Sequence, residues 1–325
     1  MTISIKINKN MNVLSLFDGI SCGRIALDRA NIKVDQYFAS EIDRYAIKVS
    51  QHNYHNTIQL GDVTKINLDS LPQIDLLMGG SPCQGFSTAG KHLNFDDPRS
   101  KLFFEYVRVL NYLKVKNPNI KFLLENVVMK KEHQKVISDQ LGVLPIMINS
   151  SLVSAQSRKR LYWTNIDGVI QPEDRKIKLS DIIQEDYDAI WVFPRGNNQG
   201  GLKNYGEKSP TVTSSSFDNN FLIYRGGDIR TFPRYKSPGV KRCGRLEIRK
   251  DDKSNCITTV DNTALLVKPD GFYRKFSSEE LELLQTIPVG YTSVISKTQR
   301  NRCIGNGWTV DVIAHILSFW RSGDN

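Results

Sequence analysis

Short apolar runs alternate with amphipathic segments along the first half of the chain. The apolar runs predict buried strands at Val13–Phe17, Gln36–Ser40, Ile74–Met78, Lys121–Leu124 and Leu144–Asn149. Between these runs, apolar residues at helical spacing predict helices at Gly23–Ala30, Ile42–His52, Lys101–Leu113 and Glu132–Leu141. Strands that alternate with helices at this spacing predict an α/β fold with a doubly wound, mostly parallel sheet.

The pattern changes after about residue 170. Residues 171–272 are rich in Gly, Ser, Thr, Asn and basic side chains, and they predict short strands with few helices. Helical periodicity returns at Ser277–Gln285, where Ser277 and Glu280 have the spacing of a capping box, and again at Val310–Trp320. We therefore expect an α/β domain at 11–170 that is completed by 273–325, with a smaller β-rich domain inserted at 171–272.

Composition narrows the class of protein. The 325 residues are 40% hydrophobic and 24% charged, which is typical of a soluble globular protein, and the net charge is +10. Such a basic protein often binds a polyanion such as nucleic acid, although the charge could serve solubility alone. No apolar run is long enough to cross a membrane, and Met1–Asn10 lacks the apolar region of a signal peptide. The five cysteines form no Cys-x-x-Cys pair, which favours a reducing compartment and predicts no metal site.

Three segments suggest a nucleoside cofactor. Leu16–Gly23 forms a glycine-containing turn between the first strand and the first helix, but its spacing departs from the dinucleotide fingerprint and disfavours a pyrophosphate. Glu41 ends the second strand, where a carboxylate can accept hydrogen bonds from ribose hydroxyls, and Asp62 ends the third, within reach of an adenine amino group. Each feature alone could be an ordinary turn, and together they favour a cofactor without a diphosphate.

Three further segments carry candidate chemistry. Gly79–Ser87 places Cys83 on a loop at the carboxyl end of the sheet, where it is either a nucleophile or an inert buried thiol. Glu125 follows a buried apolar run and is either functional or a helix cap. Gln156–Arg160 is either part of the same site or a solvated basic surface.

In this order, the motifs resemble those of the C5-cytosine DNA methyltransferase family, over roughly residues 11–166 and 272–320. The matching segments are Phe17-Asp-Gly, Glu41, Asp62, Pro82-Cys-Gln, Glu125-Asn-Val, Gln156-x-Arg-x-Arg, Arg274–Pro288 and Gly305–Ala314. Trp308 stands where many bacterial members have Val-Pro, and with Glu125-Asn-Val-Val it makes the chain more similar to the de novo methyltransferase branch.

The resemblance implies the S-adenosylmethionine-dependent methyltransferase fold and S-adenosyl-L-methionine as cofactor. The residues that it implies for cofactor binding are Phe17, Asp18, Gly19, Ile20, Ser21, Cys22, Glu41, Ile42, Asp62, Val63, Pro82, Asn306, Gly307 and Trp308.

It also implies a covalent mechanism on a cytosine that has been flipped out of the duplex. Cys83 is expected to attack C6, and Glu125 to share a proton with N3 and accept a hydrogen bond from the exocyclic amine. Arg160 is expected to hold O2, and Arg158 to support the site electrostatically.

The inserted domain is expected to recognise the target in double-stranded DNA. Its segment 225–250 contains nine basic and two acidic residues, a local charge of 9 − 2 = +7. The residues expected to contact DNA are Gln84, Ser87, Arg99, Arg234, Lys236, Lys241, Arg242 and Arg245. Two alternatives stay open, namely the same chemistry on tRNA and a non-catalytic DNA-binding relative. We also expect a cytoplasmic monomer of prokaryotic or phage origin, whose cognate restriction endonuclease, if any, forms no stable complex with it.

Overall fold

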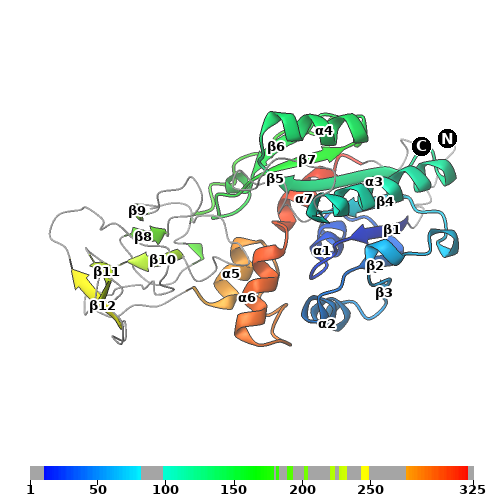
Figure 1. Cartoon of the computed structure of the whole chain (residues 1–325). Coiled ribbons are helices and arrows are strands. Elements are labelled where there is room, and N and C mark those ends of the chain that lie inside the picture. Colours follow the sequence, from blue (N-terminus) through cyan, green and yellow to red (C-terminus); the bar gives the residue numbers. More distant parts are fainter. Residues whose placement is uncertain are drawn as a thin grey trace, which may run out of the picture.

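A seven-stranded mixed sheet forms the centre of the computed structural model. The model describes residues 11–81, 98–178, 181–182, 189–192, 201–203, 220–223, 227–232, 243–248 and 276–320. Across the sheet the strands follow one another as β3 (Ile58–Gln59), β2 (Val34–Ser40), β1 (Met11–Leu16), β4 (Leu76–Gly79), β5 (Lys121–Val127), β7 (Lys159–Thr164) and β6 (Ile146–Asn149) (Figure 1). The sequence predicts five of these strands to within a few residues.

The strand β7 is antiparallel to both of its neighbours, whereas the pairs from β3 to β5 are parallel. The sequence analysis left this strand out and read its first residues as a basic segment. Only a short connection, including η3 (Ser150–Leu152), separates β6 from β7, and so short a connection suits antiparallel pairing. The sheet is therefore mixed, because β7 lies between β5 and β6 and is antiparallel to both.

Helices cover both faces of the sheet. Successive strand residues point to opposite faces, so apolar strand residues face a layer of helices on each side. Val13, Tyr37, Met78 and Leu123 belong to one core cluster, which also contains residues of α1 (Cys22–Arg29), α2 (Arg44–Asn53) and α7 (Val310–Leu317). The neighbouring strand residues belong to a second cluster with α3 (Pro98–Lys116) and α4 (Lys131–Leu141). Figure 1 shows these two layers of helices on either side of the strands.

The chain reverses its direction of growth between β1 and β4, and such a switch point leaves a crevice at the carboxyl ends of the strands. The segments that follow β1, β2, β4 and β5 all meet at this edge. These segments contain most of the residues that the motifs single out.

The C-terminal segment packs against the first part of the chain. Its helices are α5 (Ser278–Leu284), α6 (Lys297–Asn306) and α7, and α7 packs along α1. The predicted capping box is confirmed: Glu280 N donates to Ser277 Oγ (3.1 Å), and Ser277 N donates to Glu280 Oε2 (2.7 Å). The sequence analysis missed α6.

Some predicted helix bounds differ from those of the structure, and two of them concern α2 and α7. The second helix begins at Arg44 rather than at Ile42, because Asp43 accepts a hydrogen bond from Tyr45 N (2.9 Å) and acts as its N-cap. Ile42 is thereby left outside the helix. The last helix ends at Leu317 rather than at Trp320.

Strands also occur in residues 171–272. In one sheet β8 (Ala189–Val192) lies between β9 (Gly201–Lys203) and β10 (Asn220–Ile223), with antiparallel pairing. A separate antiparallel pair consists of β11 (Gly227–Phe232) and β12 (Cys243–Ile248). Over the described ranges of the whole chain, no helix is long and apolar enough to cross a membrane.

Candidate active site and cofactor-binding edge

The turn after β1 has an unusual backbone. Phe17, Gly19 and Ser21 have φ values of 57°, 59° and 61°, a region that side chains other than glycine rarely adopt. Two non-glycine residues in this region store strain that the surrounding contacts must offset, and such strain is concentrated at functional sites. This turn opens α1 at the carboxyl edge of the sheet.

The carboxyl group of Asp18 holds this turn from the inside. Ser21 Oγ donates to Asp18 Oδ2 (2.5 Å), and Tyr37 OH donates to Asp18 Oδ1 (2.7 Å). Burial raises the pKa of Asp18 to about 6; the hydrogen bonds from Ser21 and Tyr37 oppose this rise, and the negative charge of Glu41 adds to it. The side chain of Asp18 therefore faces the protein, and its predicted role in cofactor binding would act through the turn.

Glu41 joins the same turn to the end of β2. Its Oε2 accepts a hydrogen bond from Gly19 N (2.8 Å), and its Oε1 accepts from Ile42 N (2.7 Å) and Asp43 N (2.8 Å). The structure thus brings together two residues that the sequence analysis assigned to one site. Beside them the side chain of Ile42 is 78% exposed, which leaves an apolar surface open at the edge of the sheet.

Asp62 follows β3 and caps the short helix η1 (Val63–Lys65). Its Oδ1 accepts hydrogen bonds from both Thr64 N and Thr64 Oγ1 (2.9 Å each), and these bonds lower the pKa of its carboxyl group. Its Oδ2 lies 4.0 Å from Lys65 Nζ. The neighbouring Val63 is buried in the second core cluster, so its side chain serves packing.

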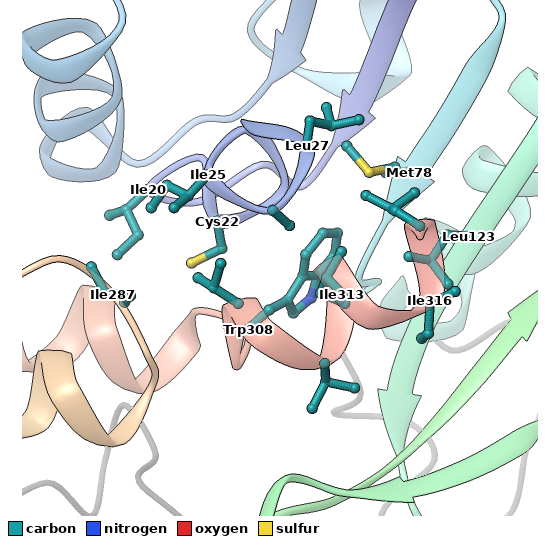
Figure 2. Packing of buried hydrophobic residues seen from close by; sticks show 14 of the residues in the cluster. Ile20, Cys22, Ile25, Leu27, Met78, Leu123, Ile287, Trp308, Ile313 and Ile316 are labelled. Carbon is teal, nitrogen blue, oxygen red and sulfur yellow. The ribbon is translucent and has the colours of Figure 1, made fainter. Parts of the chain in front are cut away.

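Several other residues of the predicted cofactor set are also buried. The side chains of Ile20, Cys22 and Trp308 pack in the first core cluster, and Figure 2 shows Trp308 among them, between α1 and α7. Burial raises the pKa of Cys22 to about 12, so its sulfur stays a neutral thiol at neutral pH. Asn306, by contrast, is exposed at the end of α6, next to the buried Gly307.

The two predicted catalytic residues on strands form an ion pair. Glu125 on β5 and Arg160 on β7 meet with 2.9 Å between Oε1 and Nε, and their side chains are 11% and 13% exposed. Glu125 lies opposite Tyr162, and Arg160 lies opposite Val127, so the pair is a diagonal contact on one face of the sheet. Arg160 is therefore positioned by β7, the strand that the hydrophobic pattern missed.

Arg158 lies behind this pair. It is buried, and its NH2 donates to the backbone oxygen of Gly307 (3.2 Å). Burial and the nearby charge of Arg160 lower the pKa of Arg158 to about 9. The guanidinium therefore remains mostly charged at neutral pH and joins the segment before β7 to the C-terminal motif.

Gly80 and Ser81, the last described residues before Cys83 in the sequence, lie beside the same pair. Asn126 Nδ2 donates to Ser81 Oγ (3.2 Å), which ties the residue after Glu125 to the residue before Pro82. A Cβ atom on Gly80 would lie 2.8 Å from Trp308 Nε1 and 3.2 Å from Glu125 Oε2, so only glycine fits there. The sequence analysis quoted Gly80 and Asn126 within motifs but gave them no role, because only their tertiary contacts distinguish them.

Some predicted site residues lie outside the described residues. These are Pro82, Cys83, Gln84, Ser87, Arg234, Lys236, Lys241 and Arg242. Arg99 and Arg245 lie in α3 and β12, for which the structure describes the backbone at these two positions.

Comparison with known protein families gives a match over most of the chain. The profile of the family described as C-5 cytosine-specific DNA methylase matches residues 11–319. The chain belongs to this family. The description of the family names a class of enzymes, the cytosine-specific DNA methylases.

Two relatives illustrate the sequence similarity. The chain is 37% identical over 191 residues to the orphan methyltransferase M.SPRI of Bacillus phage SPR, an alignment that covers 54% of this chain and 43% of the relative. It is 40% identical over 166 residues to the type II methyltransferase M1.ScrFI of Lactococcus lactis subsp. cremoris, covering 48% of this chain and 41% of the relative. The match thus spans less than half of the length of either relative.

Solved structures share the fold over nearly the whole chain. The methyltransferase EhMeth of Entamoeba histolytica has a TM-score of 0.64 at 18% identity, covering 96% of this chain and 98% of that one. A mutant of Spodoptera frugiperda DNMT2 has a TM-score of 0.60 at 21% identity, covering 95% and 99%. This family member therefore has the fold of C5 methyltransferases.

Proposed function

We propose that the protein transfers a methyl group from S-adenosylmethionine to C5 of a flipped-out cytosine in a specific sequence of duplex DNA. The observation that carries this proposal is the largely buried ion pair of Glu125 and Arg160, 2.9 Å apart, close to Ser81, which precedes Pro82 and Cys83 in the sequence. A carboxyl group and a guanidinium, joined by the thiol of Cys83, would form a set that activates a pyrimidine ring.

The residues at the ends of β2 and β3 fit the proposed cofactor. The carboxylates of Glu41 and Asp62 are acceptors for hydroxyl and amino groups, and the exposed Ile42 offers a surface for an adenine ring. The open space beside Gly19 and Gly61, where an added Cβ atom would meet nothing within 4 Å, leaves room for a ligand. S-adenosylmethionine, when bound, supplies the methyl group, and these residues would hold its nucleoside.

In the proposed mechanism, the Cys83 thiolate forms a bond to C6, which makes C5 nucleophilic. The carboxyl group of Glu125, in its protonated form, donates a proton toward N3 as charge builds up on the ring, and Arg160 donates a hydrogen bond to O2. Arg158 adds a fixed positive charge behind them, which favours that build-up. After C5 has gained the methyl group, Glu125 takes back the proton from N3, a water molecule removes the C5 proton, the bond from C6 to sulfur breaks, and the thiolate is regenerated.

Duplex DNA is the proposed partner because residues 171–272 include a strongly basic stretch, with charge +7 over 225–250. We propose that residues 171–272 form the target-recognition domain and that the catalytic domain consists of 11–170 and 273–325. We also propose a cytoplasmic monomer that needs no stable complex with an endonuclease. The phage and bacterial relatives support only the proposed location.

The proposal is tested with duplex DNA in which 5-fluorocytosine replaces cytosine. A fluorine at C5 cannot leave as a proton would, so the Cys83–C6 bond should persist after methyl transfer and give a protein–DNA adduct that survives denaturing electrophoresis. Cys83→Ala should give no adduct and no methylation, whereas Cys303→Ala, which removes a buried thiol of α6, should give both.

Parallel assays with unmodified duplex DNA and with tRNA separate the remaining readings. If the protein methylates tRNA but not duplex DNA, its substrate is tRNA and the proposed DNA substrate is wrong. DNA binding without methylation of either substrate would contradict the proposed enzyme activity, and an adduct with Cys83→Ala would exclude Cys83 as the nucleophile.

A further inference from the structure

Gln285 follows α5 at the seam between the C-terminal segment and the rest of the chain. Its side chain is fully buried, with 0% exposure. Its Nε2 donates to the backbone oxygens of Ile304 (3.1 Å) and Gly307 (3.2 Å), and its Oε1 accepts from Gln156 Nε2 (3.1 Å) and Thr309 Oγ1 (2.8 Å). The amide thus uses both of its donors and accepts two hydrogen bonds, a satisfied network of the kind that fixes one arrangement of a core.

This network reaches the start of the strand that carries Arg160. Gln156 Nε2 and Ser154 Oγ both donate to the backbone oxygen of Leu284, at 2.9 Å and 2.6 Å. Gln156 is itself fully buried and lies two residues before Arg158. The segment that enters β7 is therefore held against the end of α5.

The network also reaches the C-terminal motif. The backbone oxygen of Gly307 accepts hydrogen bonds from both Gln285 Nε2 and Arg158 NH2, each at 3.2 Å. The next residue, Trp308, has its indole against Gly80, and Glu125 Oε2 lies beside the same glycine. The amide of Gln285 and the guanidinium of Arg158 therefore share one acceptor, the Gly307 oxygen, and the residue that follows Gly307 is Trp308.

We propose that Gln285 is a positioning residue for the reaction. Its amide fixes the Gly307 carbonyl and so sets the placement of Arg158 and Trp308 around Glu125 and Gly80. This proposal rests on the proposed function for its kinetic consequence, while its structural consequence can be measured without any activity.

The change Gln285→Met tests this role, because methionine has a similar length but no hydrogen-bonding amide. Ile304 O, Gly307 O, Gln156 and Thr309 would each lose one hydrogen bond and would rearrange to compensate. A displacement of about 1 Å in a catalytic site can cost roughly a hundredfold in rate, so we expect kcat to fall roughly a hundredfold. The matched control is Ser278→Ala, which removes the buried hydrogen bond from Ser278 Oγ to Asn301 Oδ1 between α5 and α6 (2.7 Å) and should keep kcat within about twofold.

The structural readout is fluorine NMR of protein labelled with 5-fluorotryptophan. The chain has four tryptophans, and the Trp308 signal is the one that disappears in Trp308→Phe. Gln285→Met should shift this signal, while Ser278→Ala should leave it in place even where both variants lower the melting temperature equally.

An unshifted Trp308 signal in Gln285→Met, or an equal shift in Ser278→Ala, would overturn the proposal. So would a wild-type kcat in a Gln285→Met protein that methylates cytosine. If the wild-type protein methylates no substrate, the proposed function fails, and the Trp308 signal alone then decides the role of Gln285.

Discussion

Two parts of the carboxyl edge of the sheet, named below after their proposed roles, are built in different ways. At the edge formed by β1, β2 and β3, which we call the cofactor edge, the carboxylate of Glu41 accepts three backbone N–H groups and Asp62 caps a short helix. At the edge formed by β5 and β7, which we call the catalytic edge, Glu125 and Arg160 form a largely buried ion pair. At the cofactor edge the carboxylates bind backbone N–H groups, whereas at the catalytic edge two charged side chains bind each other.

The difference indicates where each kind of change should act. A carboxylate that holds a turn affects ligand binding through the backbone. Its removal weakens several backbone hydrogen bonds at once. In the proposed mechanism the buried charged pair would act directly on the reacting atoms, and removal of one partner leaves the other uncompensated. We therefore expect changes at the catalytic edge to lower the rate, and changes at the cofactor edge to alter affinity or stability.

The largest effect should come from Glu125→Gln. Loss of the proton donor should lower kcat about a thousandfold, within the ~10²–10⁴ range for general acids and bases, while the affinity for S-adenosylmethionine stays the same. Glu105→Gln is the control, because it breaks an ion pair of similar length, 2.8 Å to Arg108, on α3. Single-turnover methylation and calorimetric cofactor binding provide the measurements. If Glu125→Gln lowered cofactor affinity as much as it lowers kcat, the catalytic edge would not differ from the cofactor edge in its effect.

The buried carboxyl group of Asp18 should make stability depend on pH. Its pKa rises from 3.8 to about 6 on folding, which corresponds to about 3 kcal/mol. Because the folded pKa is raised, this stabilisation is fully present below pH 3.8 and is lost as the pH rises through about 6. The free energy of unfolding of the wild type minus that of Asp18→Asn should therefore fall by up to about 3 kcal/mol across this window.

Denaturant titrations of both proteins at several pH values would measure that difference, in which the other titrating groups largely cancel. A difference that stays constant with pH would mean that Asp18 is as well solvated as an ordinary surface carboxylate.

Two adjacent glycines allow a sharper comparison. A Cβ on Gly80 would collide with Trp308 at the catalytic edge, and a Cβ on Gly79 would lie 2.8 Å from the ring of Tyr106 on the opposite face. Either change to alanine should cost about 1–3 kcal/mol of stability, because both overpack the core. Only Gly80→Ala should also lower kcat, by more than tenfold. Equal kcat losses at equal melting temperature would argue that stability, and not local geometry, limits the rate.

The smallest effect is expected at the exposed Ile42. Because its side chain is 78% exposed, Ile42→Ser should leave the free energy of unfolding within about 0.5 kcal/mol of wild type. Loss of an apolar surface under the adenine should weaken cofactor binding about three- to fivefold, or somewhat under 1 kcal/mol. Val115→Ser, at an 84% exposed position on α3, is the control that should change neither quantity. An unchanged dissociation constant for Ile42→Ser would show that the side chain of Ile42 does not contribute to cofactor binding.

Much of the fold was predictable from local patterns. The alternation of apolar runs and amphipathic segments identified five strands of the sheet, and Ser277 with Glu280 marked the start of α5. These features depend on residues close in sequence, so a reading of the chain can find them. The strand β7 and the helix α6 escaped because charged residues in both interrupt the apolar pattern.

The sequence by itself determined the family to which the chain belongs, since the residue types and the order of its motifs are fixed before folding. Only the tertiary structure decided where these residues lie and what they contact. It placed β7 between β5 and β6, which brings Arg160 to Glu125; it turned Asp18 inward and left Ile42 exposed; and it saturated Gln285 with partners from two distant segments. The physical reason is that burial and long-range hydrogen bonds depend on how the strands are ordered and how the helices pack, and neither is encoded in neighbouring residues.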